Sequence, residues 1–409
     1  MRSVTVRQCA VLVGGLGTRL GALTANAPKP LLPCGDRPFL AWLLREFLRF
    51  GVEEFVLLTG YRATDVEASL QSLSALLPRE ARIIVSEEPA AAGTGGALYH
   101  ASDRLEQRFL LCNGDSLFDC NLARLLSAED DADTIGRMML RRVDDASRYG
   151  VVTLQGDHVS GFSARSTGGA AGLINAGIYL FDRRVVNGLT PVCSLENDIL
   201  PQLATEGALR GTVSEGYFRD IGIPDDFARA QQEVPGLLHR RALFLDRDGV
   251  VNVDHGYVGS RDRFEWTPGS LEAIHEATDA GWHVFIVTNQ SGVARGLYDE
   301  AAVVTLHDWV SDEARRAGGT IDDIRYCPFH EDAVVPEYRR ASDWRKPGPG
   351  MLLDLIRAWE LDPSGCVLVG DQPTDMAAAD AAGIRAFHFP GGNLAEFVRP
   401  LIQEPACRC

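Results

Sequence analysis

Short apolar runs alternate with longer amphipathic stretches along both halves of the chain. The apolar runs predict strands at residues 4–13, 54–58, 82–85, 109–112, 243–245, 284–287 and 366–369. The amphipathic stretches predict helices at residues 38–50, 63–76 and 271–280. Alternation of strands and helices is typical of a parallel sheet flanked by helices. We therefore predict an α/β protein whose domains are each a mainly parallel sheet covered by helices.

A change of motifs divides the chain near residues 231–240, where the sequence QQEVPGLLHR carries a proline and a glycine. A length of 409 residues allows two or three domains. We place the first domain at residues 1–235 and the second at residues 236–409.

A glycine-rich loop, GGLGTRL, follows the first predicted strand. Its candidate nucleotide-binding residues are Gly14, Gly15, Gly17, Thr18 and Arg19. Glycines let backbone N–H groups approach a phosphate chain closely. The loop is not a Walker A motif, and Leu20 stands where a GxGxxG motif needs glycine, so an ordinary tight turn is the alternative. The preceding strand and Arg19 favour phosphate binding, and Lys29 adds a second cation in the stiff segment PKP.

Two further motifs in this half follow predicted strands. Gly95 lies in GTGG, which opens a helix whose N-terminus suits an anion or a base edge. Asp115 ends the segment NGD after the strand 109–112, where it is a candidate Mg²⁺ ligand. Taken alone, NGD is also a common turn.

The order of these motifs resembles that of the sugar-1-phosphate nucleotidyltransferases, over roughly residues 8–232. The segments LVGGLGTRL, GTGGAL, NGDSLFD, RYG and DIGIPDDF are most similar to heptose 1-phosphate guanylyltransferases. The resemblance implies a Rossmann-like domain in which a sugar phosphate attacks the α-phosphorus of GTP and pyrophosphate leaves. It implies that the glycine-rich loop holds the triphosphate, and that Arg19 and Lys29 serve catalysis.

The same resemblance also implies which residues bind the metal ion and which bind the sugar. It implies that Asp115 and Asp220 hold Mg²⁺ and that Asn175 and Glu196 face the sugar. The family usually has the motif FxEK after the RYG strand, and its lysine binds the sugar phosphate. This chain has FSAR there, with Arg165 at the lysine position and alanine at the glutamate position. Arginine can hold a phosphate in a different geometry, so an altered sugar preference or a weaker transferase is predicted.

The second half is organised around the segment LFLDRDGVVN, residues 243–252. Three apolar residues lead into Asp246, Asp248 follows two residues later, and Gly249 lets the chain turn. Ligands collect at the carboxyl ends of parallel strands. Two carboxylates there can hold Mg²⁺ and act on a phosphate as nucleophile and general acid. A lone DxD is more often a surface turn, but the residues downstream favour chemistry.

Three later segments supply partners for these carboxylates. Their candidate residues are Thr288, Asn289, Arg345, Lys346, Asp371 and Asp375. A threonine hydroxyl and backbone N–H groups can hold phosphate oxygens, and the two cations stand beside a proline. Asp371 ends a strand, and Asp375, one helical turn later, can support it.

This motif order resembles that of the haloacid dehalogenase-like (HAD-like) phosphatases, over roughly residues 241–390, and implies a Rossmann-like domain. The segments DRDGVVN, GYVG, TNQSGVARGLYDE and RKPGPGM closely resemble those of heptose 1,7-bisphosphate 7-phosphatases, and histidinol-phosphate phosphatases are near relatives. The resemblance implies that Asp246 is the nucleophile and that Asp248 is the general acid and base. Mg²⁺ would be held by Asp246, the Asp248 carbonyl and Asp371. The phosphate would be held by Thr288 and Lys346.

Most ligands of the structural zinc site that these relatives usually carry are missing. Their Cys-x-His and Cys-x-Cys pairs are replaced by Cys327-Pro328-Phe329 and Ser342-Asp343-Trp344. Cys327 and the nearby His330 cannot by themselves close a tetrahedral site. We therefore predict no structural zinc and expect the two aromatic side chains to fill the space.

The amino-acid composition limits which classes of binding partner and which cellular location we expect. A formal charge of −16 and a pI near 5.0 argue against a nucleic acid or an anionic membrane as partner. No apolar stretch is long enough to predict a membrane span. The chain's first residues resemble a strand and not a signal peptide. Nine cysteines without paired spacing fit reduced thiols in the cytoplasm.

The two resemblances name consecutive steps of one route, which predicts a bifunctional enzyme. Its phosphatase would remove the 7-phosphate of heptose 1,7-bisphosphate with Mg²⁺. Its transferase would then join the heptose 1-phosphate to GTP, giving GDP-heptose and pyrophosphate. Two alternatives stay open: a transferase for another sugar or nucleotide, and a first half that only binds a nucleotide sugar and regulates the phosphatase. The sequence fixes neither the sugar nor the oligomeric state.

Overall fold

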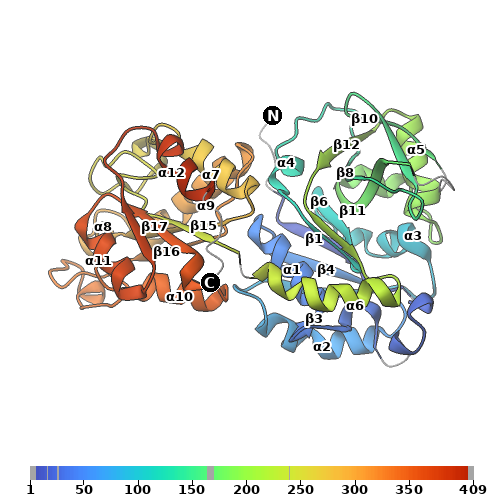
Figure 1. Ribbon diagram of the computed structural model, residues 1–409, viewed down its shortest axis with the longest axis horizontal. Helices are drawn as coiled ribbons and strands as arrows, with labels where there is room; N and C mark the ends of the chain where they lie inside the picture. Colours follow the sequence, from blue (N-terminus) through green and yellow to red (C-terminus); the bar gives the residue numbers. More distant parts are fainter. Residues whose placement is uncertain (1–5, 16, 25–26, 164–169, 239, 404–409) are drawn as a thin grey trace. The chain divides into compact units, whose positions relative to one another are not determined.

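The computed structural model describes residues 6–15, 17–24, 27–163, 170–238 and 240–403 (Figure 1). The chain forms two compact units, residues 1–236 and 237–409, which are described separately. Among the described residues, no helix combines the length and the apolar character that a membrane crossing needs.

In the first unit, the described strands form a large mixed sheet in the order β5-β4-β1-β6-β11-β8-β12-β10-β9. These strands are β1 (Gln8–Leu12), β4 (Glu54–Thr59), β5 (Arg82–Glu87), β6 (Arg108–Asn113), β8 (Gly136–Val143), β9 (Val151–Gln155), β10 (His158–Ser163), β11 (Gly172–Asp182) and β12 (Leu209–Ser214). The four strands from β5 to β6 are parallel to one another. The strand β11 runs antiparallel to both β6 and β8, so the parallel prediction fits one half of this sheet.

Further strands and helices belong to the first unit. They are β2 (Pro33–Cys34), β3 (Arg37–Pro38), β7 (Ser116–Asp119), β13 (Tyr217–Asp220), α1 (Phe39–Arg49), α2 (Ala63–Ala75), α3 (Gly93–His100), α4 (Ala123–Leu126), α5 (Leu200–Thr205) and α6 (Pro224–Glu233). The strands β7 and β13 pair antiparallel. Strand side chains alternate between the two faces of the main sheet. Ala10 and Val56 accordingly pack with Leu98 of α3 and Leu200 of α5, while the neighbouring Phe55 is fully buried on the opposite face.

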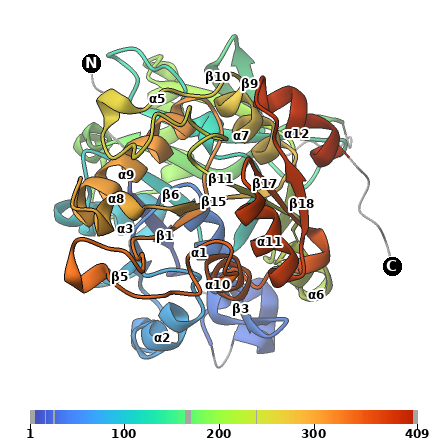
Figure 2. The same ribbon diagram turned by 90° about the vertical axis from the view of Figure 1, so that its left-hand side faces the viewer.

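The second unit has a parallel sheet in the order β16-β15-β14-β17-β18. Its strands are β14 (Ala242–Leu245), β15 (His283–Asn289), β16 (Asp323–Cys327), β17 (Cys366–Gly370) and β18 (Arg385–His388). Its helices are α7 (Ser270–Asp279), α8 (Ser291–Ala294), α9 (Glu300–Arg316), α10 (Gly350–Ala358), α11 (Pro373–Ala382) and α12 (Leu394–Gln403). Figure 2 shows β17 and β18 side by side in this sheet.

Helices cover both faces of this second sheet. Leu243 and Leu245 belong to the apolar cluster with α7, α9 and α12, whereas Phe244 belongs to the cluster with α10 and α11. Figure 1 shows these two sets of helices on opposite sides of the strands. A strand that is buried on both faces reads as a continuous apolar run, which is what residues 242–245 show. The carboxyl end of this strand leads directly into the motif DRDG.

The helix α10 tests how much this second core contributes to stability. Leu355 is fully buried, while Leu353, two residues earlier, is 40% exposed. We expect Leu355→Ala to lower the free energy of unfolding by about 2–5 kcal/mol because it leaves a cavity. The control Leu353→Ala should change it by less than about 0.5 kcal/mol.

Tryptophan fluorescence during urea unfolding measures this difference, because five of the six tryptophans, all except Trp42, lie in the second unit. Equal effects of the two substitutions would contradict the assigned packing of α10.

Candidate active sites

In the first unit, the carboxyl ends of three parallel strands lie next to one another. The backbone N–H of Val13 donates to Leu58, and that of Gly114 donates to Leu12, so the strands β1, β4 and β6 meet there. A Cβ atom at Gly14 would lie 3.0 Å from the backbone nitrogen of Gly60, which explains a glycine by close packing. A Cβ atom at Gly15 would meet nothing within 4 Å. Packing within the described residues therefore does not require glycine at position 15, and its contact with a nucleotide stays a prediction.

The remaining predicted loop residues vary in how far they are described. Gly17 has a φ of +60°, in the left-handed region that favours glycine. The Arg19 side chain is exposed. The side chain of Thr18 lies outside the described part of the chain.

Lys29 lies between two predicted metal ligands. Its Nζ is 2.5 Å from Oδ2 of Asp115 and 3.6 Å from Oδ1 of Asp220. Lys29 itself is only 7% exposed. The pairing of β7 with β13 places Asp220 opposite Ser116, and the N–H of Ile221 donates to the carbonyl of Asp115. Residues 105 positions apart in the sequence thus meet at one point.

These two carboxylates suit a divalent cation. Burial raises the pKa of Asp220, the charge of Asp115 raises it further, and Lys29 opposes both effects. Two adjacent carboxylates repel each other, and a hard cation with oxygen ligands relieves that repulsion. The donor set therefore fits Mg²⁺.

The predicted sugar-side residues come together around a buried tyrosine. Asn175 donates to the hydroxyl of Tyr179 at 2.6 Å and accepts from the N–H of Gly177. Glu196 accepts from the hydroxyl of Thr94 at 2.6 Å. Burial and then the nearby charge of Glu196 raise the pKa of Tyr179. A sugar hydroxyl could exchange with these polar contacts.

Two predicted residues need separate comment. The N–H of Gly95 donates to the carbonyl of Cys193, so that donor is already used, and a Cβ atom would lie 2.7 Å from the sulfur of Cys193. The nucleotide contact predicted for Gly95 therefore stays a prediction that this N–H does not support. Arg165 lies outside the described residues.

In the second unit, a buried lysine also lies between two carboxylates. Nζ of Lys346 is 2.7 Å from Oδ1 of Asp246 and 2.6 Å from Oδ1 of Asp375. The same ammonium donates to the carbonyl of Val287, at the end of β15. Burial raises the pKa of Asp246 to about 7, with Lys346 opposing this effect. The nucleophile predicted from the sequence is thus held beside the predicted phosphate-binding cation.

Three carboxylates of this unit can share a metal ion. Asp246, Asp371 and Asp375 each offer an oxygen within 4.8 Å of the other two, the one such group of three among the described residues. Oδ1 of Asp371 is buried without a hydrogen-bond partner. A Cβ atom at Gly249 would lie 2.4 Å from Oδ2 of Asp371, so only glycine leaves room there. An unsatisfied buried carboxylate oxygen fits a Mg²⁺ ligand.

Asp248 is held by three neighbours. Arg247 donates to both of its oxygens at 3.0 and 2.9 Å, and Asn252 and Gln290 donate to one each. Arg247 is fully buried and also contacts His307 at 3.1 Å. These contacts fix the orientation of a carboxylate that can transfer a proton.

The residues that hold Asp248 were not among the candidates predicted from the sequence. Arg247 and Asn252 lie inside DRDGVVN, so the motif contained a signal for them. Nothing in the sequence around His307, in the middle of α9, pointed to the site.

The predicted phosphate-binding residues differ in their roles. Thr288 is buried at the end of β15, and its hydroxyl accepts from the side chain of Gln290. The side chain of Asn289 exchanges two hydrogen bonds with the backbone of Lys346, so it positions that lysine. Nη1 of Arg345 is buried without a hydrogen-bond partner and is available to a ligand.

Side-chain contacts hold the loop in which the resemblance to HAD-like phosphatases would place zinc ligands. Phe329 and Trp344 pack against the apolar cluster that contains Cys327, as predicted. The guanidinium of Arg340 lies 3.7 Å above the Phe329 ring. Glu300 accepts from the hydroxyls of Tyr326 and Tyr338, and Nδ1 of His330 accepts from a backbone N–H. The prediction of no structural zinc itself remains untested.

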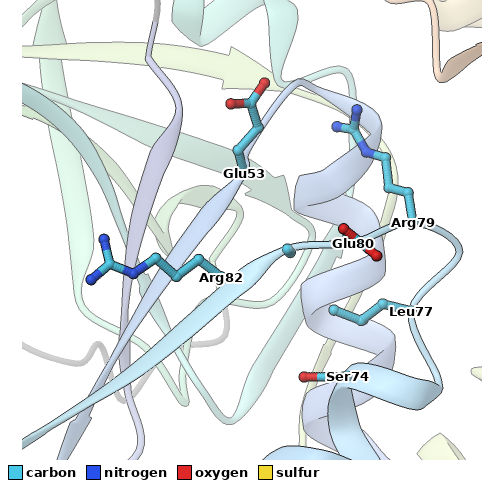
Figure 3. A pocket seen from close by; sticks show the side chains of 7 residues that line it. Glu53, Ser74, Leu77, Arg79, Glu80 and Arg82 are labelled. Carbon is cyan, nitrogen blue, oxygen red and sulfur yellow. The ribbon is translucent and has the colours of Figure 1, made fainter.

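A separate hollow of about 700 Å³ lies at the amino ends of β4 and β5 (Figure 3). It is lined by Glu53, Ser74, Leu77, Arg79, Glu80, Ala81 and Arg82. Acidic and basic side chains alternate around it, and it lies at the edge of the sheet opposite to the candidate residues. It therefore gives no support for a catalytic role.

Comparison with known proteins bears on both units. Residues 9–235 match the nucleotidyl transferase family, and residues 343–396 match the HAD-hydrolase-like family. The D-glycero-beta-D-manno-heptose-1,7-bisphosphate 7-phosphatase of Rhodopseudomonas palustris is 48% identical over 165 residues, which are 40% of this chain and 92% of that protein. Its counterpart in Escherichia coli K12 is 44% identical over 143 residues, 35% of this chain and 75% of that protein.

A solved structure matches the first half. HddC from Yersinia pseudotuberculosis, complexed with GMP-PN, has a TM-score of 0.50 and 28% identity, and the match covers 56% of this chain and 99% of that one. Both resemblances and the two-domain α/β fold predicted from the sequence are confirmed.

The buried His307 makes the stability of the second unit depend on pH. Burial, with Arg247 adding to it, holds the pKa of His307 well below its ordinary value. Below about pH 6.5 the unfolded chain binds a proton at this histidine and the folded protein does not, so stability is lost as the pH falls. We expect His307→Gln to remove about 1 kcal/mol of the stability loss between pH 7 and 5.5.

Urea unfolding followed by tryptophan fluorescence at the two pH values gives this difference. An identical loss in both proteins would show that His307 is not held neutral.

Proposed function

Since the chain belongs to the nucleotidyl transferase family and also carries a HAD-like phosphatase domain, we propose that it makes a nucleotide-activated heptose in two steps. The phosphatase unit removes the 7-phosphate of D-glycero-D-manno-heptose 1,7-bisphosphate. The transferase unit then moves a guanylyl group from GTP to the heptose 1-phosphate. The supporting observation is that one chain combines similarity to heptose bisphosphate 7-phosphatases with similarity to HddC bound to GMP-PN.

In the proposed transfer, the sugar phosphate oxygen attacks the α-phosphorus and pyrophosphate leaves. Little covalent chemistry is needed, so position and charge decide the rate. The loop with Gly14, Gly15 and Gly17 approaches the triphosphate through its backbone, and Arg19 and Lys29 neutralise the developing charge. Asn175 and Glu196 orient the sugar. A Mg²⁺ held by Asp115 and Asp220 would supply further charge neutralisation.

In the proposed hydrolysis, a carboxylate oxygen of Asp246 attacks the phosphorus and forms an aspartyl-phosphate. Asp248 gives a proton to the leaving sugar oxygen and later takes one from the attacking water. Thr288 and Lys346 hold the phosphoryl oxygens, and Asn289 keeps Lys346 in place. A Mg²⁺ on Asp246, the Asp248 carbonyl and Asp371 would neutralise the phosphate.

The two sites can be separated by single substitutions. We expect Asp115→Asn to abolish release of pyrophosphate and leave release of phosphate intact, because Asp115 lies in the transferase unit. Asp246→Asn should abolish release of phosphate and leave transfer from GTP to heptose 1-phosphate intact. The measurement follows phosphate and pyrophosphate separately, with Mg²⁺, GTP and either sugar phosphate.

Each outcome of that assay has a meaning. Phosphate without pyrophosphate from the wild-type protein would exclude transfer from GTP to this sugar phosphate. UTP, ATP, CTP and other sugar phosphates would then separate a transferase of another specificity from a first half that only binds a nucleotide sugar. Absence of both products would exclude the heptose bisphosphate.

Chelation tests the metals. We expect EDTA to abolish both activities, because both carboxylate sites fit Mg²⁺, and added Mg²⁺ to restore both without added zinc. Elemental analysis of the purified protein should find less than about 0.1 zinc per chain, against about one for a structural site. A zinc requirement for recovery would contradict the prediction of a zinc-free loop.

The proposed compartment is the cytoplasm. The cysteines among the described residues form no disulfide with one another, which supports a reducing environment.

A further inference from the structure

An arginine-rich pocket lies beside the candidate metal site of the transferase unit. It has a volume of about 310 Å³, and Asp220 forms part of its wall. Four arginines from different segments line it: Arg141, Arg148, Arg219 and Arg229. In a chain whose formal charge is −16, such a local gathering of cations is informative.

Two of these arginines are neutralised by the protein. Arg148 lies 2.6 Å from a carboxylate oxygen of Asp226. Arg219 lies 2.5 Å from Glu233 and 3.6 Å from Asp226. These ion pairs hold the pocket wall in shape and leave little charge for a ligand.

The other two form no close ion pair within the described residues, and the charge of Glu233 acts on Arg229 only at longer range. No described carboxylate lies within 4.0 Å of Arg141 or Arg229. The guanidinium of Arg141 lies over the ring of Phe218, and its Nε is buried without a hydrogen-bond partner. A buried charged donor without a partner is costly, and an anion would satisfy it.

The position of the pocket selects the anion. The cations that act most strongly on Asp220 are Lys29 and Arg19, which belong to the proposed nucleotide side. Asp220 forms part of the pocket wall and lies 3.6 Å from Lys29, so an acceptor bound in the pocket would lie next to the proposed metal and nucleotide site. Guanidinium groups bind phosphate through paired hydrogen bonds, and the four arginines of the pocket outnumber the carboxylates of Asp220 and Asp226 that line it with them, so the wall has an excess of positive charge for a phosphate monoester.

We propose that this pocket binds a phosphate monoester of the acceptor sugar. The proposal rests on the transferase function proposed above and does not require Arg165. The phosphate is either the one that reacts or a second phosphate on the same sugar.

A matched set of variants tests the pocket: Arg141→Met, Arg229→Met and the control Arg142→Met. Methionine keeps the length of the side chain and removes its charge. Arg142 is the next residue on β8, is exposed and does not line the pocket. Arg229 is exposed on α6, so its replacement should leave the fold intact.

The measurement is calorimetric titration of the full chain with heptose 1-phosphate, heptose 1,7-bisphosphate or unphosphorylated heptose. Divalent cations are left out so that neither unit turns over. Binding at the phosphatase unit is common to all four proteins, so differences among them report the pocket. Each pocket variant should lose affinity roughly tenfold for a phosphorylated sugar, and the control should not.

Loss with the 1-phosphate identifies the reacting phosphate, and loss with the bisphosphate alone identifies a second one. Equal affinities in all four proteins, or no binding to the wild type, would overturn the proposal. Pocket-dependent binding in a protein that releases no pyrophosphate would overturn the proposed transfer and keep the pocket. Pyrophosphate release together with equal affinities in all four proteins would support the proposed transfer and overturn the proposed pocket.

Discussion

A buried lysine held between two carboxylates is the interaction on which both candidate sites depend. Lys29 joins Asp115 and Asp220, and Lys346 joins Asp246 and Asp375. Each group has two carboxylates for one ammonium; the group around Lys346 is almost fully buried, whereas the side chains of Asp115 and Asp220 are 38% and 29% exposed. Removing Lys346 would leave two carboxylates buried and unpaired, which is strongly unfavourable. Removing Lys29 would leave two partly exposed carboxylates that repel each other. The lysine therefore keeps the carboxylates together, and their residual charge attracts a cation.

The topology of each sheet determines which residues can form such a group. In the second unit, Asp246 and Asp371 follow neighbouring parallel strands, so their meeting is a consequence of strand order. In the first unit, Asp115 follows a strand of the main sheet, but Asp220 reaches it through the small β7–β13 pair. Local strand pairing thus completes a site that the main sheet begins.

Strand order and local strand pairing explain how much of each site could be predicted from the sequence. Asp246 and Thr288 follow apolar runs, so their place at one sheet edge was predictable. The contact of Arg247 with His307 was not, because it depends on how a helix distant in the sequence packs. The antiparallel course of β11 was also missed, since an apolar run looks the same in either direction. Asp220 was predicted from the resemblance of the first half to the nucleotidyltransferases, and its spacing in the sequence alone would not have selected it.

Contacts that need no metal hold the loop around Cys327. Zinc binds thiolate and not thiol, so a zinc site needs cysteines that lose their protons readily. Here burial raises the pKa of Cys327, which keeps the sulfur protonated and apolar in character. Glu300 between two tyrosine hydroxyls, and Arg340 over Phe329, fix the same loop through contacts that need no metal. Because this segment leads into Arg345 and Lys346, the same contacts also determine where those cations lie.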